Sequence, residues 1–104
     1  MILEIAVPNV NDSFSRVVLD GEQYAIRFTW NMFANRWSFG LYTVQHEPIV
    51  VGIRIVPHFP LNLQLRDSSL PNGVFGVYTE HDEVGRMDFV NGKARFVFVQ
   101  NEEA

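Results

Sequence analysis

The sequence contains no cysteine, which excludes disulfide bonds and thiolate-bound metal sites. It also lacks any apolar run near the ~20 residues that a membrane helix needs. The longest such run, residues 49–56, is interrupted by Arg54. The start of the chain, Met1 to Ile5, has neither the basic region nor the apolar stretch of a signal peptide. We therefore expect neither membrane insertion nor export.

Positive charge is scarce as well. The formal net charge is −4, and lysine and arginine form no basic stripe along the chain. Proteins that bind nucleic acid by neutralising phosphates usually carry such a stripe. Charge-driven binding of nucleic acid is therefore not expected.

Motifs for catalysis and metal binding are missing too. His46, His58 and His81 are far apart and form no H-x-x-x-H pair. No serine lies in a G-x-S-x-G context, and there is no glycine-rich phosphate loop. The densest carboxylate group, Glu80 to Glu83 followed by Asp88, could hold a hard cation through oxygen ligands, but a solvated acidic turn is the favoured interpretation. We expect a non-enzymatic protein without cofactor or metal.

Aromatic and β-branched residues are plentiful, and they alternate with polar ones. Apolar residues make up 47% of the chain and include nine Phe. In residues 23–30 and 37–43 every second side chain is large and apolar, which is typical of antiparallel strands with one buried face. Asp20-Gly21, Asn72-Gly73 and Asn91-Gly92 are turn dipeptides. The pattern predicts an all-β, antiparallel meander that forms a small barrel or a two-layer sandwich.

The chain length suits a single β domain over residues 1–104, with a short flexible tail at 100–104. No segment has a helical apolar stripe. The expected strands lie between the turn dipeptides and the prolines: 2–7, 14–19, 23–30, 37–43, 49–56, 61–65, 74–79, 86–90 and 93–99.

Two of these strands, 49–56 and 96–99, are apolar on both faces. Either they run through the middle of a two-layer core, or another chain covers one face. Arg54 inside the first of them needs a partner if it is buried. An intrachain carboxylate, a position at a sheet edge and an interchain partner all remain open for it.

The segment between the two tryptophans, Trp30 to Trp37, reads WNMFANRW. The tryptophans continue the apolar alternation of their strands, so they are expected to close a core hairpin. Met32 and Phe33 do not fit this alternation. They lie in a predicted turn, where small polar residues are usual, so large apolar side chains are unexpected there. They are predicted to form either a folded-back lid or an exposed patch.

An ordered set of short motifs extends over nearly the whole chain. Its members are Ile5–Asn9, Phe14-Ser15, Val18–Tyr24, Ile26, Phe28, Trp30-Asn31, Arg36-Trp37, Leu41-Tyr42, Pro48–Pro57, Pro60-Leu61, Leu70–Gly73 and Arg95–Val99. This set resembles the small plug-type proteins of contractile phage tail baseplates, found in myophages and prophages. The chain departs from the family at residues 83–88, where a longer or more regular Asp/Gly-rich loop would be expected.

The resemblance implies an all-β virion component that packs against the hub, tube and spike of the tail baseplate and is assembled in the host cytoplasm. Tail assemblies are symmetric, so it implies several copies per particle. Candidate contact residues are bulky or charged side chains in the predicted loops, together with the strand arginine: Met32, Phe33, Arg36, Arg54, His58, Phe59, Arg66 and Asp67. Arg66 and Asp67 could also pair with each other.

A second hypothesis, of a different class, is a soluble β module of prophage or bacterial origin that binds a small molecule or a peptide. In that case Trp30, Trp37 and Tyr42 would stack on a sugar or an aromatic ligand. The hypothesis requires the three rings to be accessible from one side.

Overall fold

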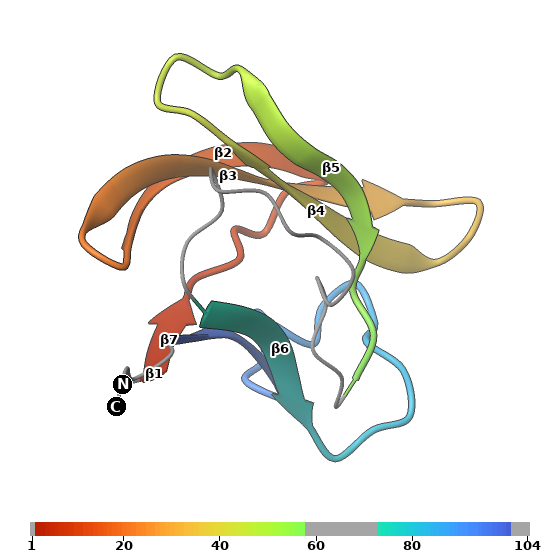
Figure 1. The fold of residues 1–104 in the computed structure, drawn as a ribbon. Helices are drawn as coiled ribbons and strands as arrows, with labels where there is room; N and C mark the ends of the chain where they lie inside the picture. The colour runs from red at the N-terminus through yellow and green to blue at the C-terminus, as the bar shows by residue number, and fades with distance from the viewer. Residues whose placement is uncertain (1, 58–72, 101–104) are drawn as a thin grey trace.

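A computed structural model describes residues 2–57 and 73–100 and shows two antiparallel sheets packed face to face (Figure 1). Three strands form the order β1-β7-β6, from Ile2–Ile5, Ala94–Gln100 and Gly73–Thr79. Four consecutive strands form the other sheet in the order β2-β3-β4-β5, from Asp12–Leu19, Glu22–Asn31, Arg36–Tyr42 and Pro48–Arg54. The sheets do not close into a barrel, so of the two predicted all-β forms the sandwich is confirmed.

The four-stranded sheet is a meander whose first hairpin follows from its turn residues. Asp20 and Gly21 both have positive φ, 53° and 79°, between β2 and β3. Two residues of this conformation match the twist of adjacent strands, so the register Leu19 to Glu22 continues without a break to Asp12 and Thr29. The sequence predicted this turn correctly.

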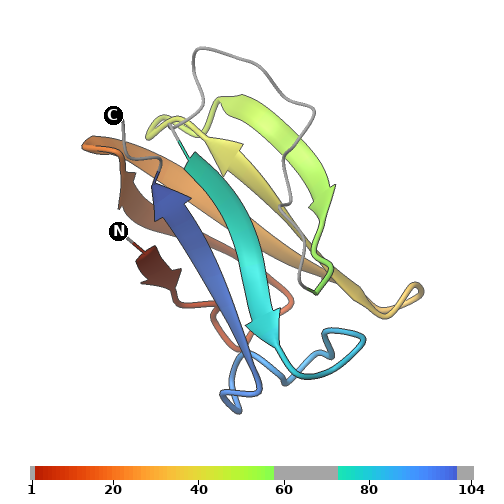
Figure 2. The ribbon, with the colours of Figure 1, turned by 60° about the horizontal axis from the view of Figure 1, so that its bottom comes forward.

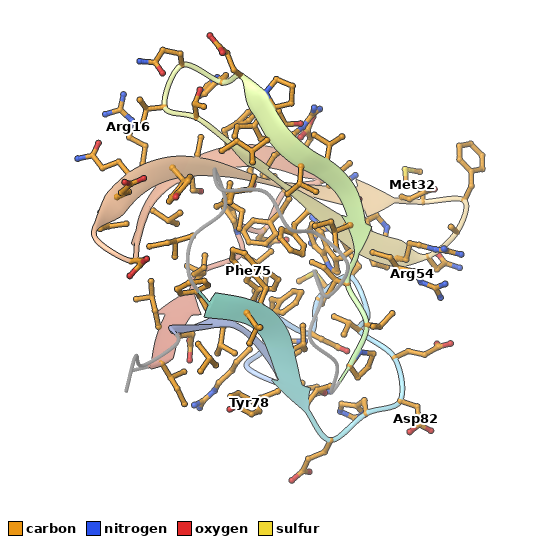
Figure 3. All side chains as sticks on the ribbon, viewed as in Figure 1. Arg16, Met32, Arg54, Phe75, Tyr78 and Asp82 are labelled. Atoms are coloured by element: carbon orange, nitrogen blue, oxygen red, sulfur yellow. The ribbon has the colours of Figure 1, made fainter. Side chains whose placement is uncertain are left out.

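The core between the sheets is dominated by phenylalanine. Phe28 and Phe39 of the four-stranded sheet contact Phe96 of β7 at centroid distances of 5.1 Å each, and Phe39 lies 5.0 Å from Phe75 of β6. Figure 3 shows Phe75 directed between the two layers. These rings interlock edge to face or tilted, as aromatic pairs prefer.

The central strand β7 lies between β1 and β6, as Figure 2 shows from another side. Phe96, Val97 and Phe98 are all buried. The expectation that residues 96–99 run through the middle of a layer is therefore confirmed. β7 extends to Gln100, which pairs with Gly73, so residue 100 belongs to the strand. The rest of the predicted tail, residues 101–104, lies outside the described residues.

The other strand that is apolar on both faces lies at an edge instead. β5 is the last strand of its sheet, and Val51 on it is 54% exposed. Gly52 has φ 70°, and the pairing of β5 with β4 shifts register near Leu41. The option of a central position for residues 49–56 was wrong, because β5 ends the sheet and pairs with β4 alone among the described strands.

The strand predicted at 86–90 is also wrong. These residues form turns closed by local hydrogen bonds, with the Asn91 amide donating to Met87 O (2.9 Å) and the Lys93 amide to Asp88 O (2.9 Å). The Asp88 carboxylate accepts the Gly85 amide at 2.8 Å, and such side chain to backbone bonds compete with strand pairing. Phe89 packs against the core from this turn, which explains the strand-like apolar alternation.

The remaining strand bounds within the described residues agree with the structure to within two residues; β1, for example, ends at Ile5 instead of residue 7. The strand expected at 61–65 and the turn residue Asn72 lie outside the described residues. The described part of the chain contains no helix that could span a membrane. The single-domain assignment remains a prediction.

Candidate interface at the hairpin tip

The β3–β4 hairpin changes character along its length. At its base Trp30 and Trp37 are cross-strand partners with ring centroids 5.5 Å apart. Trp37 is 1% exposed, and Trp30 is partly buried against the core. The prediction that the two tryptophans close a core hairpin is therefore confirmed.

The base is also tied to the turn that carries Phe89. The Trp37 indole N–H donates to Gly85 O at 3.3 Å, and the Arg86 guanidinium lies 5.2 Å from the centre of the Trp37 ring. Arg86 donates to Asn11 Oδ1 (2.8 Å) and Asn9 Oδ1 (3.0 Å). The hairpin base is thus fixed from both sheets.

Beyond the base, the tip carries its large side chains in solvent. Phe33 is 100% exposed and Met32 is 66% exposed. Figure 3 shows Met32 on the hairpin where it projects past the sandwich. Of the two predictions for these residues, the exposed patch is correct and the folded-back lid is wrong.

The tip is nevertheless well defined, because Asn31 caps it. Its Oδ1 accepts the amides of Phe33 (3.0 Å) and Ala34 (3.1 Å), which forms an Asx turn. Asn35 takes the left-handed conformation, with φ 51°, which asparagine tolerates better than most residues. The loop therefore presents Met32 and Phe33 from a fixed backbone.

A groove of about 390 Å³ lies beside the tip. Its walls are the hairpin, the end of β5 with the residues after it, and the turn after β6; the side chains that bear charge are Arg36, Arg54, Asp82 and Glu83. The Arg36 Nε atom is buried and has no hydrogen-bond partner in the described part of the chain, although Arg36 as a residue is only partly buried. Two of the predicted contact residues, Arg36 and Arg54, thus line the same groove.

Arg54 needs no buried partner, because it is exposed on the edge strand, at a position that pairs with Ser38. Of the options left open for it, the structure shows the position at a sheet edge, and an interchain partner stays a prediction. The sequence did not reveal that Arg36 and Arg54 share a groove, because their proximity depends on the β4–β5 register. The bulge at Gly52 sets that register, and a glycine within a strand was its only signal.

The outer face of the four-stranded sheet carries a second polar cluster. Arg27 donates to both carboxylate oxygens of Asp12, at 2.7 and 2.6 Å. This bidentate contact lowers the pKa of Asp12 and raises that of Arg27. Phe14 lies below the same guanidinium (5.4 Å), stacks on His46 (4.4 Å) and meets Tyr42 edge-on (5.0 Å). No motif in the sequence predicted that Asp12, Arg27, Phe14, Tyr42 and His46 would form a cluster.

The rings of the ligand-binding hypothesis are not brought together. Trp37 is buried in the core, and Tyr42 lies with Phe14 on the opposite, outer face of the sheet. The three rings therefore cannot form one stacking surface.

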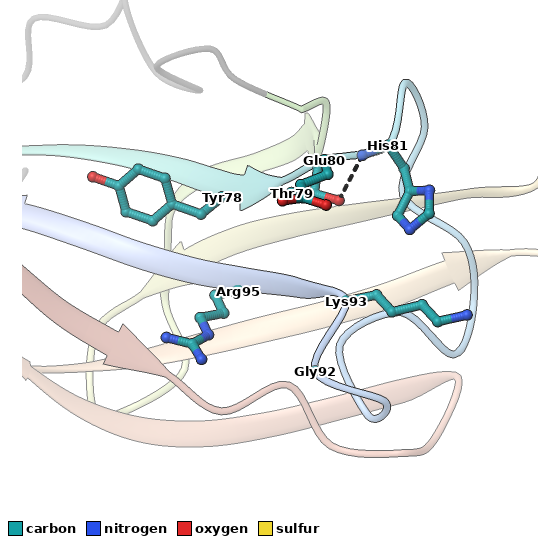
Figure 4. A pocket seen from close by; sticks show the side chains of 7 residues that line it. All are labelled: Tyr78, Thr79, Glu80, His81, Gly92, Lys93 and Arg95. Atoms are coloured by element: carbon teal, nitrogen blue, oxygen red, sulfur yellow. Dashed lines mark hydrogen bonds between the residues drawn. The ribbon is translucent and has the colours of Figure 1, made fainter.

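A shallow hollow of about 540 Å³ lies where β6 ends and β7 begins, around Tyr78, Glu80, His81, Lys93 and Arg95 (Figure 4). The Thr79 hydroxyl accepts the His81 amide at 3.1 Å and holds the start of the turn. Among residues 2–57 and 73–100, no three His, Asp or Glu side chains converge as metal ligands would, the acidic turn at 80–83 included.

Four of the predicted contact residues, His58, Phe59, Arg66 and Asp67, lie outside the described residues. Comparison with known families gives a match over residues 2–102 to the family model described as cyanophage baseplate Pam3 plug gp18. No curated protein matches the sequence.

Proposed function

Because the chain belongs to the family of the cyanophage baseplate Pam3 plug gp18, and so has a structural role in a phage tail baseplate, we propose that it docks on neighbouring tail proteins through the β3–β4 hairpin tip. The observation that carries this proposal is the complete exposure of Phe33 on a capped turn. The proposed neighbours are the hub, tube and spike.

The exposed side chains of Met32 and Phe33 would gain free energy by leaving water for an interface. Burying a Phe or Met side chain is favourable by roughly 1.5–3 kcal/mol each. Aromatic and Met residues are enriched at interfaces, and aromatic anchors often dominate binding energies. Since Asn31 already fixes the backbone of the tip, little conformational entropy is lost on docking. Met32 and Phe33 thus have the properties of preformed anchors.

The charged groove beside the tip supplies the polar part of the proposed interface. Arg36 and Arg54 offer donors, and the Arg36 Nε has no acceptor among the residues that the structure describes. A neighbour that presents a carbonyl or carboxylate oxygen beside the docked tip would satisfy it. His58, Phe59, Arg66 and Asp67 remain further candidate contacts.

The role we propose is non-enzymatic, with several copies per particle, since tail assemblies are symmetric. The virion tail is the location that the family implies, and assembly in the host cytoplasm is part of the proposal.

The test is incorporation of a Met32→Ser/Phe33→Ser double variant into tails during infection. We expect the isolated variant to fold with unchanged stability and to be missing from purified particles. A matched control is Met87→Ser/Val90→Ser, which removes two other exposed apolar side chains, 42% and 45% accessible, from a different loop. Normal incorporation of the tip variant would contradict the proposed docking role.

A further inference from the structure

The edge of the four-stranded sheet at β2 lacks the short length, the proline and the bulge that often prevent edge strands from pairing with other chains. β1 has only four residues, and β5 begins with Pro48 and carries the bulge at Gly52. β2, by contrast, has eight residues in unbroken register with β3 and contains no proline. Long, regular edge strands of this kind are templates for further pairing.

The hydrogen-bond pattern shows which backbone groups of β2 are available. The Trp30 amide donates to Asn11 O at 2.8 Å, so Asn11 and Trp30 form a hydrogen-bonded pair. In an antiparallel ladder such hydrogen-bonded pairs recur at every second residue. The backbone N–H and C=O groups that bond to β3 are therefore those of Ser13, Ser15, Val17 and Leu19. The N–H and C=O groups of Asp12, Phe14, Arg16 and Val18 therefore point away from β3, toward the edge at which no other described strand pairs.

The side chains of these same residues form a self-complementary series. The outer face of β2 carries Asp12, Phe14, Arg16 and Val18 in that order, and the exposed Val10 lies two residues before Asp12, in the bend that leads into the strand. Val10, Phe14 and Val18 are 47%, 43% and 58% exposed in that order, and both charged members are exposed. When a second copy of this series runs antiparallel to the first with the two Phe14 side chains opposite each other, Asp12 faces Arg16 on each side. Val10 then faces Val18 at each end.

We propose that β2 pairs antiparallel with β2 of a second copy of this chain, about a two-fold axis at Phe14. The pairing joins two four-stranded sheets into one. Phe14 then lies opposite Phe14 of the second copy in a hydrogen-bonded pair, and Asp12 lies opposite the second copy's Arg16. Opposite charges in directly facing positions stabilise a sheet, whereas like charges destabilise it.

Neighbouring registers do not have this complementarity. An axis at Arg16 would place two arginines opposite each other. An axis at Ser15 would set Phe14 opposite arginine and Asp12 opposite valine. The contact between Asp12 and Arg27 does not prevent the pairing at Phe14, since a carboxylate has about four acceptor sites.

The inner face of β2 supports the same register. The Ser13 hydroxyl is buried and has no hydrogen-bond partner within residues 2–57 and 73–100. Buried hydroxyls without partners are uncommon in folded proteins. The two-fold axis at Phe14 places Ser15 of the second copy directly opposite Ser13, in the closer, non-hydrogen-bonded type of pair, where serine hydroxyls can bond across strands.

Sedimentation velocity on the isolated chain over a range of concentrations tests the proposal, with charge-reversed variants to fix the register. The wild type should form dimers. Arg16→Asp alone and Asp12→Arg alone should each weaken self-association at least about tenfold, because both facing pairs become like-charged. A mixture of the two variants should dimerise again, since each acid then faces a base. Lys93→Asp, an exposed charge reversal on another loop, should leave the dimer unchanged.

A wild-type chain that stays monomeric at all concentrations would overturn the proposal. Dimers that survive Arg16→Asp, or variants that do not re-associate on mixing, would overturn the register at Phe14. Circular dichroism of each variant reports whether it is folded. Asp12→Arg could fail to fold because it removes the contact between Asp12 and Arg27. In that case Arg16→Asp decides the outcome. The Arg16 side chain makes no hydrogen bond or ion pair with the described part of the chain, so the substitution removes none.

Discussion

The base and the tip of the β3–β4 hairpin use large apolar side chains in opposite ways. At the base, Trp37 is almost completely buried and hydrogen-bonded to the facing turn. At the tip, Phe33 is completely exposed, and only its backbone is fixed. Asn31 lies at the boundary, as the last residue of β3 and the cap of the turn. Hydrophobicity alone therefore does not reveal a residue's role; its position relative to the strand pairing does.

The largest effect on this comparison should come from removing the base. Trp37→Ala is expected to cost about 3–5 kcal/mol of the free energy of unfolding, because it leaves a cavity between the sheets and an unpaired Gly85 carbonyl. Phe33→Ala should change the free energy by no more than about 0.5 kcal/mol, as for other exposed positions. Denaturant unfolding measures both. Equal losses would show that base and tip do not differ as described.

A smaller effect is expected at the boundary. Asn31→Ala removes the acceptor of the Phe33 and Ala34 amides and should cost about 1 kcal/mol. Asn31→Asp keeps the acceptor and serves as the matched control. Relaxation of the amides at residues 33 and 34, measured by NMR, should show a more mobile tip in the alanine variant only. A tip that stays equally rigid in both variants would mean that the Asx turn does not hold it.

The smallest effect should come from the ion pair between Arg27 of the hairpin strand β3 and Asp12 of the neighbouring β2, on the outer face of the four-stranded sheet. Arg27 lowers the pKa of Asp12 in the folded protein. The ion pair therefore contributes fully to the free energy of unfolding above the ordinary carboxyl pKa of 3.8, and this contribution is lost as the pH falls through the lower pKa of the folded state. Both side chains are more than one-third exposed, so after solvent screening we expect less than about 1 kcal/mol. The stability difference between wild type and Asp12→Asn should vanish in strong acid. A difference that grows on acidification would contradict this sign.

The sequence predicted those parts of the fold that depend on local patterns. Alternation found the strands of both sheets, and Asp20-Gly21 gave the first hairpin. The turn at 86–90 was missed because Phe89 reaches the core from a loop, which imitates the alternation of a strand. Local patterns cannot distinguish the two cases, since the difference lies in the hydrogen bonds that Asp88 makes.

The candidate site was predictable in part, for the same reason. Met32 and Phe33 stood out because they broke the alternation, and the structure places both in solvent. The groove around Arg36 and Arg54 depends on strand register and on a turn far away in the sequence, at 82–84. The β2 edge depends on which strand ends the sheet. Neither property is encoded in a short segment.

The central claim, that the tip is free in the isolated chain and covered in the tail, can be measured directly with one thiol. The chain has no cysteine, so Ala34→Cys introduces a unique label beside Met32 and Phe33 without removing either. The thiol should react rapidly in the isolated protein, be protected in assembled tails, and react again when those tails are denatured. A thiol that reacts as fast in intact tails as in the isolated chain would contradict the account.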